Sequence, residues 1–284
     1  HAPIVAFLDA DDWWAKGKLR ADLDAFAQNP SIAAVGHGVF EVRDDKIADE
    51  FVVPPACRID LSNVSAARHA LFGGFFLGTS RLAVRREALD RIGPIPEELV
   101  FCADTPILTL VLALGGAMLI DQPLCYYRLH ADNLYAFEPG NVDKARKKYE
   151  IFSFLVAFLP KRLAELGVPP ETISAVIEPH QLEVERFRLQ FEKGSRWETF
   201  LVERRAYHLA YRNPTHGYAL FKWLVGAVTL LLPPERFYEL RNWYGRRNMG
   251  RIRGFIVDEE TAERQTFAER RSMTDPSERV DSSK

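Results

Sequence analysis

The stretch Ile4-Val5-Ala6-Phe7-Leu8-Asp9-Ala10-Asp11-Asp12 indicates the fold class of this 284-residue chain. Five apolar residues followed directly by carboxylates are typical of a buried, parallel-type strand whose carboxyl end opens into a polar loop. Ligands of open α/β sheets bind at that end of the strands. The stretch therefore predicts an α/β sheet with a ligand site beside an acidic loop.

The acidic loop itself has two interpretations. Asp9 and Asp11, separated by one small residue, can turn toward one point, and such a pair of hard oxygen ligands suits Mg²⁺ or Mn²⁺ carrying a substrate diphosphate. Alternatively the loop is a capped turn, because Asp is common after strands and at helix N-caps. In that case Asp12 caps a helix beginning near Trp13. The loop alone leaves both interpretations open.

Composition indicates a globular protein. The chain is 47% apolar and 27% charged, and its length predicts one good core plus an appended region. The formal net charge of −2 combines an acidic opening segment with a last hundred residues rich in Arg. This overall balance argues against nucleic acid as the main partner.

The cysteines and the first residue bear on the cellular context. Cys57, Cys102 and Cys125 form no CxxC pair, which favours buried free thiols in a reducing compartment, so we expect a cytoplasmic protein. The chain begins at His1 instead of Met, and an apparent core strand follows at once. We therefore expect a fragment whose natural N-terminus, with or without a targeting segment, is missing.

Periodicity predicts strands and helices in alternation up to about residue 130. The predicted helices are 15–28, 62–72, 86–92 and 106–114, and the predicted strands are 32–36, 39–42, 82–84, 117–120 and 126–130, with a hairpin turn at Asp44-Asp45. Between them, Gly73 to Ser80 is rich in small residues. It predicts either a close backbone approach to a ligand or a glycine-rich turn.

From Lys144 onward the pattern is helical, with helices expected at 144–165, 170–191, 197–211 and 218–232. The last of these is the most apolar run, yet it is shorter than the roughly 20 residues that span a bilayer. Arginines and aromatic residues flank it, which indicates a helix lying in a membrane interface at the inner face of the membrane. The alternative is a core helix followed by a solvated basic face. Residues 258–284 are charged and Ser-rich, which predicts disorder.

Four segments, in order and at plausible spacing, resemble the family 2 glycosyltransferases of the GT-A fold. Residues 7–13 look like that family's DxD loop, and Gly78-Thr79-Ser80 with 85–93 looks like its next signature. Cys102-Ala103-Asp104-Thr105 occupies the place of the family's acidic pair, and 126–133 resembles the segment that closes the catalytic domain. The resemblance covers residues 3 to about 135. Four ordered matches are far more specific than one acidic motif.

The resemblance implies roles for particular residues. Asp11 would coordinate a divalent cation on the diphosphate of a nucleotide-sugar, UDP-, GDP- or dTDP-linked, and Asp9 would contact the cation or the ribose. Asp104 would be the general base that takes the proton of an acceptor hydroxyl, which implies inversion at the anomeric carbon. The family usually carries a second acidic residue directly before the base, where this chain has Ala103. That departure puts any role of the missing carboxylate in doubt. From the residues alone, Asp104 can also be read as the N-cap of a helix starting at Pro106, a position that is compatible with catalysis.

Other residues of the matched segments carry two interpretations each. His130 would reach the metal or diphosphate, or be a hydrogen-bonded structural residue. Arg128 would contact phosphate, or pair with a surface carboxylate. Trp13 would stack on a sugar ring, although of Trp13 and Trp14 at least one belongs to the core. Gly78 and Thr79 would line the cleft for the acceptor.

The resemblance thus implies the C-terminal part of a GT-A, Rossmann-like mixed sheet in residues 1–135, a helical region in 144–257 and a tail in 258–284. The expected activity is inverting, metal-dependent, nonprocessive sugar transfer to a glycan or lipid-linked acceptor. Because the first nucleotide-binding strands are missing from the pattern, we expect this chain alone to be inactive or poorly folded. Two alternatives stay open: a noncatalytic relative that binds sugar or membrane, and a metal-dependent nucleotidyltransferase.

Overall fold

The computed structural model describes residues 2–43, 46–52, 56–73, 78–100, 102–130, 142–192, 194–210 and 216–241. All of them lie in one compact unit, His1–Trp243. The predicted fold class is confirmed, because a mixed α/β sheet is followed by helices, compatible with a Rossmann-like domain. The predicted tail at 258–284 lies outside the described residues, and the domain boundaries stay predictions.

Within the described ranges, seven strands form one sheet in the order β1-β6-β3-β7-β2, with β4 added to β3 and β5 to β7. Their bounds are β1 Ile4–Ala6, β2 Trp13–Trp14, β3 Ala34–Arg43, β4 Lys46–Val52, β5 Cys57–Ile59, β6 Leu82–Arg85 and β7 Ala117–Leu129. β3 and β7 are parallel and the other pairs antiparallel. β3 and β7 each take the place of two short strands predicted from the sequence, 32–36 with 39–42 and 117–120 with 126–130. The β3–β7 register shifts around Gly38, which keeps the ladder paired past the glycine.

Two predictions about the opening stretch are wrong. β1 is not a buried parallel strand: it is half-buried and lies antiparallel to β6 at the end of the strand order, with Ile4 opposite Arg85. An apolar run reports burial more readily than strand direction, which depends on a distant partner. No helix begins near Trp13 either, because Trp13–Trp14 pair with β7 as β2. α1 starts only at Lys18, after Gly17 with φ of 90°.

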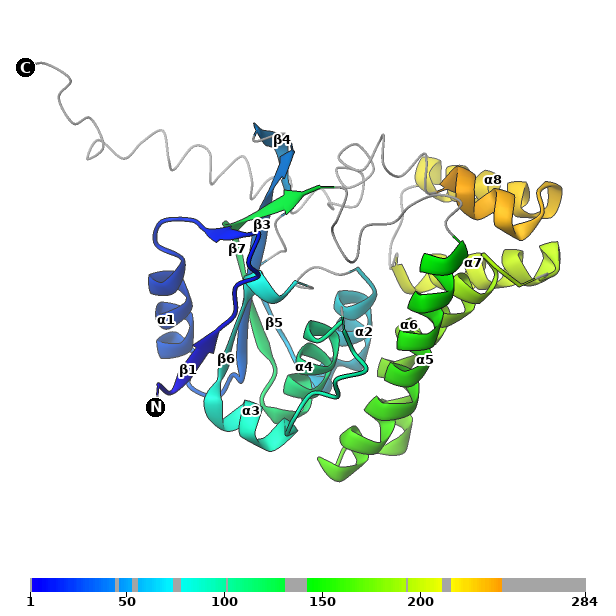
Figure 1. The fold of residues 1–284 in the computed structure, drawn as a ribbon. Coiled ribbons are helices and arrows are strands. Elements are labelled where there is room, and N and C mark those ends of the chain that lie inside the picture. Colours follow the sequence, from blue (N-terminus) through cyan, green and yellow to red (C-terminus); the bar gives the residue numbers. More distant parts are fainter. Residues whose placement is uncertain are drawn as a thin grey trace, which may run out of the picture. The chain divides into compact units, whose positions relative to one another are not determined.

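The helices cover both faces of the sheet. Their bounds are α1 Lys18–Gln28, α2 Val64–Gly73, α3 Arg86–Ile92, α4 Asp104–Val111, α5 Val142–Glu165, α6 Pro170–Arg188, α7 Arg196–Ala210 and α8 His216–Leu231, with short 3-10 turns η1 Leu61–Asn63, η2 Thr79–Arg81 and η3 Leu112–Leu114. Residues 234–241 are also helical. Alternate strand residues face opposite layers: Leu82 and Val84 join the core with α2 to α6, whereas Ala83 packs with α1. Figure 1 shows α1 on one side of the sheet and α2 and α4 on the other.

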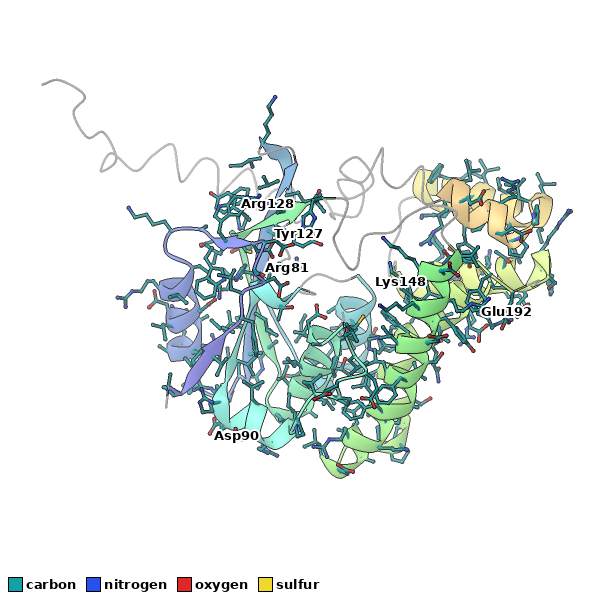
Figure 2. All side chains as sticks on the ribbon, in the orientation of Figure 1. Arg81, Asp90, Tyr127, Arg128, Lys148 and Glu192 are labelled. Carbon is teal, nitrogen blue, oxygen red and sulfur yellow. The ribbon has the colours of Figure 1, made fainter. Side chains whose placement is uncertain are left out.

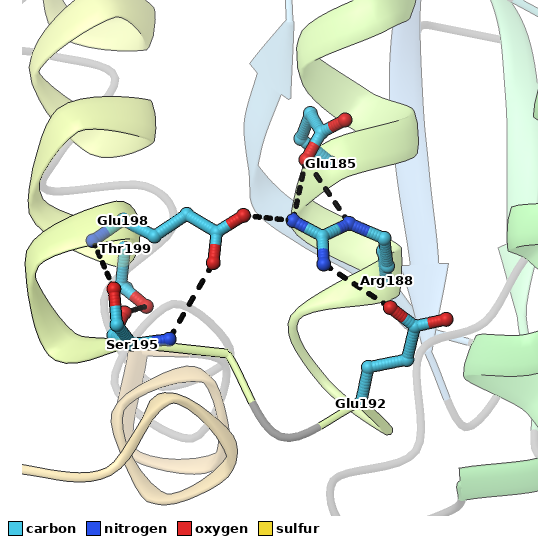
Figure 3. A network of polar contacts seen from close by, with 6 residues as sticks. All are labelled: Glu185, Arg188, Glu192, Ser195, Glu198 and Thr199. Atoms are coloured by element: carbon cyan, nitrogen blue, oxygen red, sulfur yellow. Dashed lines mark hydrogen bonds and ion pairs between the residues drawn. The ribbon is translucent and has the colours of Figure 1, made fainter.

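The turn between α6 and α7 is fixed by a polar network (Figure 3). The Arg188 guanidinium donates to Glu185 at 2.8 Å, to Glu192 at 3.1 Å and to Glu198. Ser195 and Glu198 form a capping box: the Glu198 N–H donates to Ser195 Oγ at 3.0 Å, and the Ser195 N–H donates back to the Glu198 carboxylate at 3.4 Å. This network determines where α7 starts.

Candidate functional site

Four segments that are distant in sequence meet at one end of the sheet: the loop after β1, the turn η2, the start of α4 and the end of β7. Ser80 connects η2 to the acidic loop after β1. The Asp9 N–H donates to Ser80 Oγ at 2.9 Å, and the Trp14 indole N–H donates to the Ser80 carbonyl at 3.2 Å. These are the same four segments that carry the resemblance described above.

Asp11 and His130 are in direct contact. His130 Nε2 and Asp11 Oδ2 are 2.9 Å apart, and the two side chains are 36% and 39% exposed. The end of β7 brings the imidazole to the acidic loop across 119 residues of sequence. Two side chains predicted as metal ligands are therefore adjacent and open to solvent, while their role stays a prediction.

Asp9 is turned toward η2 and not toward Asp11. Its carboxylate accepts a hydrogen bond from Thr79, which lowers its pKa, but burial has the larger effect and raises the pKa of Asp9, and the charge of Asp11 adds to the rise. Thr79, predicted to line an acceptor cleft, thus holds Asp9 in place. Asp9 also lies close enough to Asp11 for the two charges to interact.

Asp12 joins the loop to β7. Its side chain is buried, accepts the backbone N–H of Arg128 at 3.1 Å and is hydrogen-bonded to Ser80. Burial raises the pKa of Asp12, although these two hydrogen bonds oppose the rise. The sequence interpretation missed this function, because the only signal was a third carboxylate ahead of two tryptophans.

Asp104 stands at the first position of α4, two residues before the predicted start of that helix. Its carboxylate accepts the backbone N–H groups of Gly78 and Thr105, the latter at 2.9 Å. Burial raises the pKa of Asp104, and these bonds together with the positive charge of Arg81 oppose the rise. Gly78 adopts φ of 127°, a conformation that favours glycine. Asp104 and Asp9 are thus bound to the neighbouring residues Gly78 and Thr79.

An aromatic stack runs beside the acidic loop. Trp13 stacks on Tyr126 with ring centroids 5.2 Å apart, and Tyr126 stacks on Phe40 at 4.9 Å. The Arg128 guanidinium lies 5.4 Å from the Trp13 ring centre. Part of the Trp13 surface is therefore already occupied by protein.

The prediction that at least one of the two tryptophans belongs to the core is wrong, because Trp13 is exposed and Trp14 only half-buried. The ammonium of Lys18 lies 4.5 Å from the Trp14 ring centre, and this fully buried lysine pairs with Asp22 at 2.7 Å. The buried Lys18–Asp22 ion pair thus packs against the Trp14 ring next to the acidic loop.

Two further residues border the site and were not predicted. Arg81 is buried and contributes positive charge at Asp104. Tyr127 lies close to all three carboxylates of the acidic loop, and burial together with their charge raises its pKa to about 12. Figure 2 shows Arg81, Tyr127 and Arg128 at the same end of the sheet. Arg81 and Tyr127 come from η2 and β7, which lie far apart in the sequence and meet only in the tertiary structure.

The donor set fits a divalent cation that brings its own oxygen ligands. Among the described residues, no group of three or more His, Cys, Asp or Glu side chains is placed to hold a metal ion. Asp11 and His130 supply one carboxylate and one imidazole, both exposed. Mg²⁺ typically uses one or two protein carboxylates and completes its shell with substrate phosphates and water. The residues therefore fit a substrate-borne cation better than a permanent protein site.

Comparison with known proteins points to glycosyltransferases in general terms. No protein-family model matches the chain. Over 132 residues the chain is 32% identical to an uncharacterized glycosyltransferase of Nostoc sp. (strain PCC 7120), a match that covers 46% of this chain and 40% of that protein. The chain thus matches less than half the length of this relative. The similarity supports a relationship to glycosyltransferases without distinguishing family 2 from the others.

Proposed function

We propose that this protein transfers a sugar from a nucleotide-sugar to a hydroxyl group of an acceptor. The observation that carries the proposal is the convergence at η2: Asp9 binds Thr79, Asp104 binds Gly78, and the Asp11–His130 pair lies on the same acidic loop. The similarity to a protein named as a glycosyltransferase supports the same reaction class.

In this proposal the donor diphosphate binds at Asp11 and His130 with a shared Mg²⁺ or Mn²⁺, which would offset the negative charge of the departing nucleoside diphosphate. Arg128 lies on the same strand end, two residues before His130, where its guanidinium can contact a phosphate. Asp9 orients the loop and lies near the ribose. The donor is a UDP-, GDP- or dTDP-sugar.

Asp104 is the proposed general base. Its carboxylate is held at a helix start by two backbone N–H groups, and its raised pKa brings it closer to the value at which a base can accept a proton. The acceptor hydroxyl loses its proton to Asp104 as its oxygen attacks the anomeric carbon. A single displacement of this kind inverts that carbon. Gly78 and Trp13 border the space in which the acceptor, a glycan or a lipid-linked sugar, would lie.

The proposal implies a nonprocessive, family 2-like transferase that works in the cytoplasm. The cysteines of the described residues are all free thiols, two of them buried, which suits a reducing compartment.

The proposal is tested on the full-length protein with each nucleotide-sugar and Mg²⁺ or Mn²⁺, by measuring release of the nucleoside diphosphate. Asp104→Asn should lower kcat by about 10²- to 10⁴-fold, the usual contribution of a general base. Asp11→Ala should raise the metal concentration needed for half-maximal rate. Asp90→Asn, an exposed carboxylate on α3, is the matched control and should have no effect.

Two outcomes would replace the proposal. Donor binding without turnover under any acceptor would indicate a noncatalytic relative. Release of pyrophosphate from a nucleoside triphosphate would indicate a nucleotidyltransferase that uses the same acidic loop.

A further inference from the structure

The outer face of α8 is apolar and open to solvent. Leu220, Trp223, Leu224 and Leu231 are 61%, 56%, 52% and 72% exposed. They stand at helix positions i, i+3, i+4 and i+11 and so share one face. A helix on the surface of a globular protein normally presents polar side chains there. Large exposed apolar patches of this kind mark interaction surfaces.

The inner face of α8 is apolar as well and packs on the protein. The exposed apolar face is therefore additional to the face that α8 uses for packing. Val225 and Val228 pack on the small core that α6, α7 and residues 234–241 form around Val202 and Phe237. The charged residue of the apolar run, Lys222, is directed to this side, where it is half-buried near Arg241. Among the described side chains of α8, the outer face therefore presents no charged group to water.

A second tryptophan extends this surface to α7. Trp197 is 58% exposed and stacks on Phe200 with ring centroids 5.2 Å apart. Phe200 in turn lies beside Gly226 of α8, since a Cβ on that glycine would stand 3.6 Å from its ring. Two exposed tryptophans thus accompany the leucines. Tryptophan is the side chain enriched where protein meets the polar boundary of a lipid bilayer.

The sequence around α8 is rich in basic residues, since residues 204–253 contain ten Lys or Arg and two Glu. Among the described residues, Arg205, Arg236 and Arg241 are exposed on the helices next to α8. Each of them also pairs with a glutamate, Glu178 at 3.2 Å, Glu239 at 3.1 Å and Glu203 at 3.8 Å respectively. Basic side chains around an apolar helix face are complementary to a surface of anionic lipid headgroups.

The length of α8 decides between spanning and lying on a bilayer. Its 16 residues rise about 24 Å, short of the roughly 30 Å of hydrocarbon. None of the helices in the described ranges combines the length and apolar content that crossing a membrane requires. An interfacial helix needs only one apolar face and a basic surrounding.

We propose that α8 docks on an anionic lipid bilayer, lying in the plane of the interface with Leu220, Trp223, Leu224 and Leu231 inserted and Trp197 at the edge. This surface is independent of the site formed by Asp11 and Asp104. Its test therefore does not require transfer activity.

The full chain is sedimented with vesicles of phosphatidylcholine containing one quarter phosphatidylglycerol, and with vesicles of phosphatidylcholine alone. Binding should prefer the anionic vesicles and weaken as salt is raised. Trp223→Gln combined with Leu224→Gln should weaken binding by about tenfold or more, because two apolar side chains no longer leave water. Leu19→Gln combined with Leu23→Gln, which are similarly exposed on α1, should leave binding unchanged.

A second measurement separates insertion from simple adhesion. Brominated lipid should quench tryptophan emission in the wild-type protein, and Trp197→Phe with Trp223→Phe should remove most of that quenching while keeping the apolar face. Vesicle binding that is equal in the wild type and the glutamine variant would overturn the proposal. So would concentration-dependent dimers that the glutamine variant abolishes, without vesicle binding, because the face would then be covered by a second copy.

Discussion

Replacing Asp12 tests whether the acidic loop is positioned by a buried carboxylate. Asp12 accepts the Arg128 N–H at 3.1 Å and is hydrogen-bonded to Ser80. In Asp12→Ala both groups lose this partner, at about 1–2 kcal/mol each. The alanine variant no longer buries a charged carboxylate, and the desolvation penalty that it avoids offsets part of this destabilisation. We expect a net destabilisation of about 2 kcal/mol, or a fall in Tm of about 4 to 8 °C for a unit of this size.

Asp12→Asn should behave differently because the side-chain oxygen facing Arg128 is kept. We expect its stability to lie within about 1 kcal/mol of wild type at pH 7. Its pH dependence carries the sharper prediction. The pKa of Asp12 is raised above the ordinary 3.8 in the folded state, so as the pH rises from 3.8 through the folded value the unfolded state loses its proton first. This contribution to the loss of stability in that window is present in the wild type and absent from Asp12→Asn.

The assay is urea unfolding at a series of pH values from 3.5 to 7, followed by circular dichroism, with donor-binding affinity measured on the same samples. Asp90→Ala, which removes an exposed carboxylate on α3, should change stability by no more than about 0.5 kcal/mol. If Asp12→Ala is no more destabilising than this control, the carboxylate does not join the loop to β7. Equal pH profiles for wild type and Asp12→Asn would refute the burial argument.

Three further predictions concern other parts of the unit. Gly78→Ala should lower the free energy of unfolding by about 1–3 kcal/mol, because φ of 127° strains any other residue and the new Cβ stands 3.2 Å from Arg81 Nε. The same variant should lower transfer activity at least tenfold, because it displaces the N–H that binds Asp104. Burial lowers the pKa of His180 to about 4, so stability should fall by roughly 3 kcal/mol as pH drops from 6.5 toward 4, and His180→Gln should flatten that part of the profile. Glu203→Gln should cost about 3 kcal/mol in urea unfolding, because it removes the charge that faces the buried guanidinium of Arg186 at 2.9 and 3.1 Å.

Matched variants keep these predictions open to contradiction. Gly17→Ala introduces a similar backbone strain, because Gly17 has φ of 90°, but the added Cβ has no atom within 4 Å. Gly17 makes no hydrogen bond to Asp104 in the described contacts, so transfer activity should be unchanged in this variant. His37, whose pKa burial lowers from 6.5 to about 3, acts over the same pH range and beyond it, so an acid-sensitive slope between pH 6.5 and 3 should remain after His180 is replaced. Glu239→Gln loses only an exposed pair and should cost about 0.5 kcal/mol or less. A loss in any control equal to that of its test variant would contradict the reasoning.

Much of the element order could be predicted from local pattern. Helices 86–92 and 170–188 begin where Arg86 and Pro170 were expected, because apolar spacing and the proline determine them within a few residues. The ordered acidic, glycine-rich and tyrosine-containing segments also indicated which parts of the chain meet at one end of the sheet. Strand direction was not predictable, since an apolar run pairs equally well in either direction until its neighbour is known.

The roles of individual side chains within the site required the tertiary structure. Thr79 and Asp12 turned out to position other residues, because their partners lie 68 and more residues away and only the pairing of β1 with β6 and β2 with β7 brings them within hydrogen-bonding distance. Sequence by itself determined the chemistry available at the acidic loop, through Asp9 and Asp11. Tertiary structure alone decided that Asp11 lies beside His130 and that Asp12 is buried as a support, because burial and charge depend on contacts that no local pattern encodes.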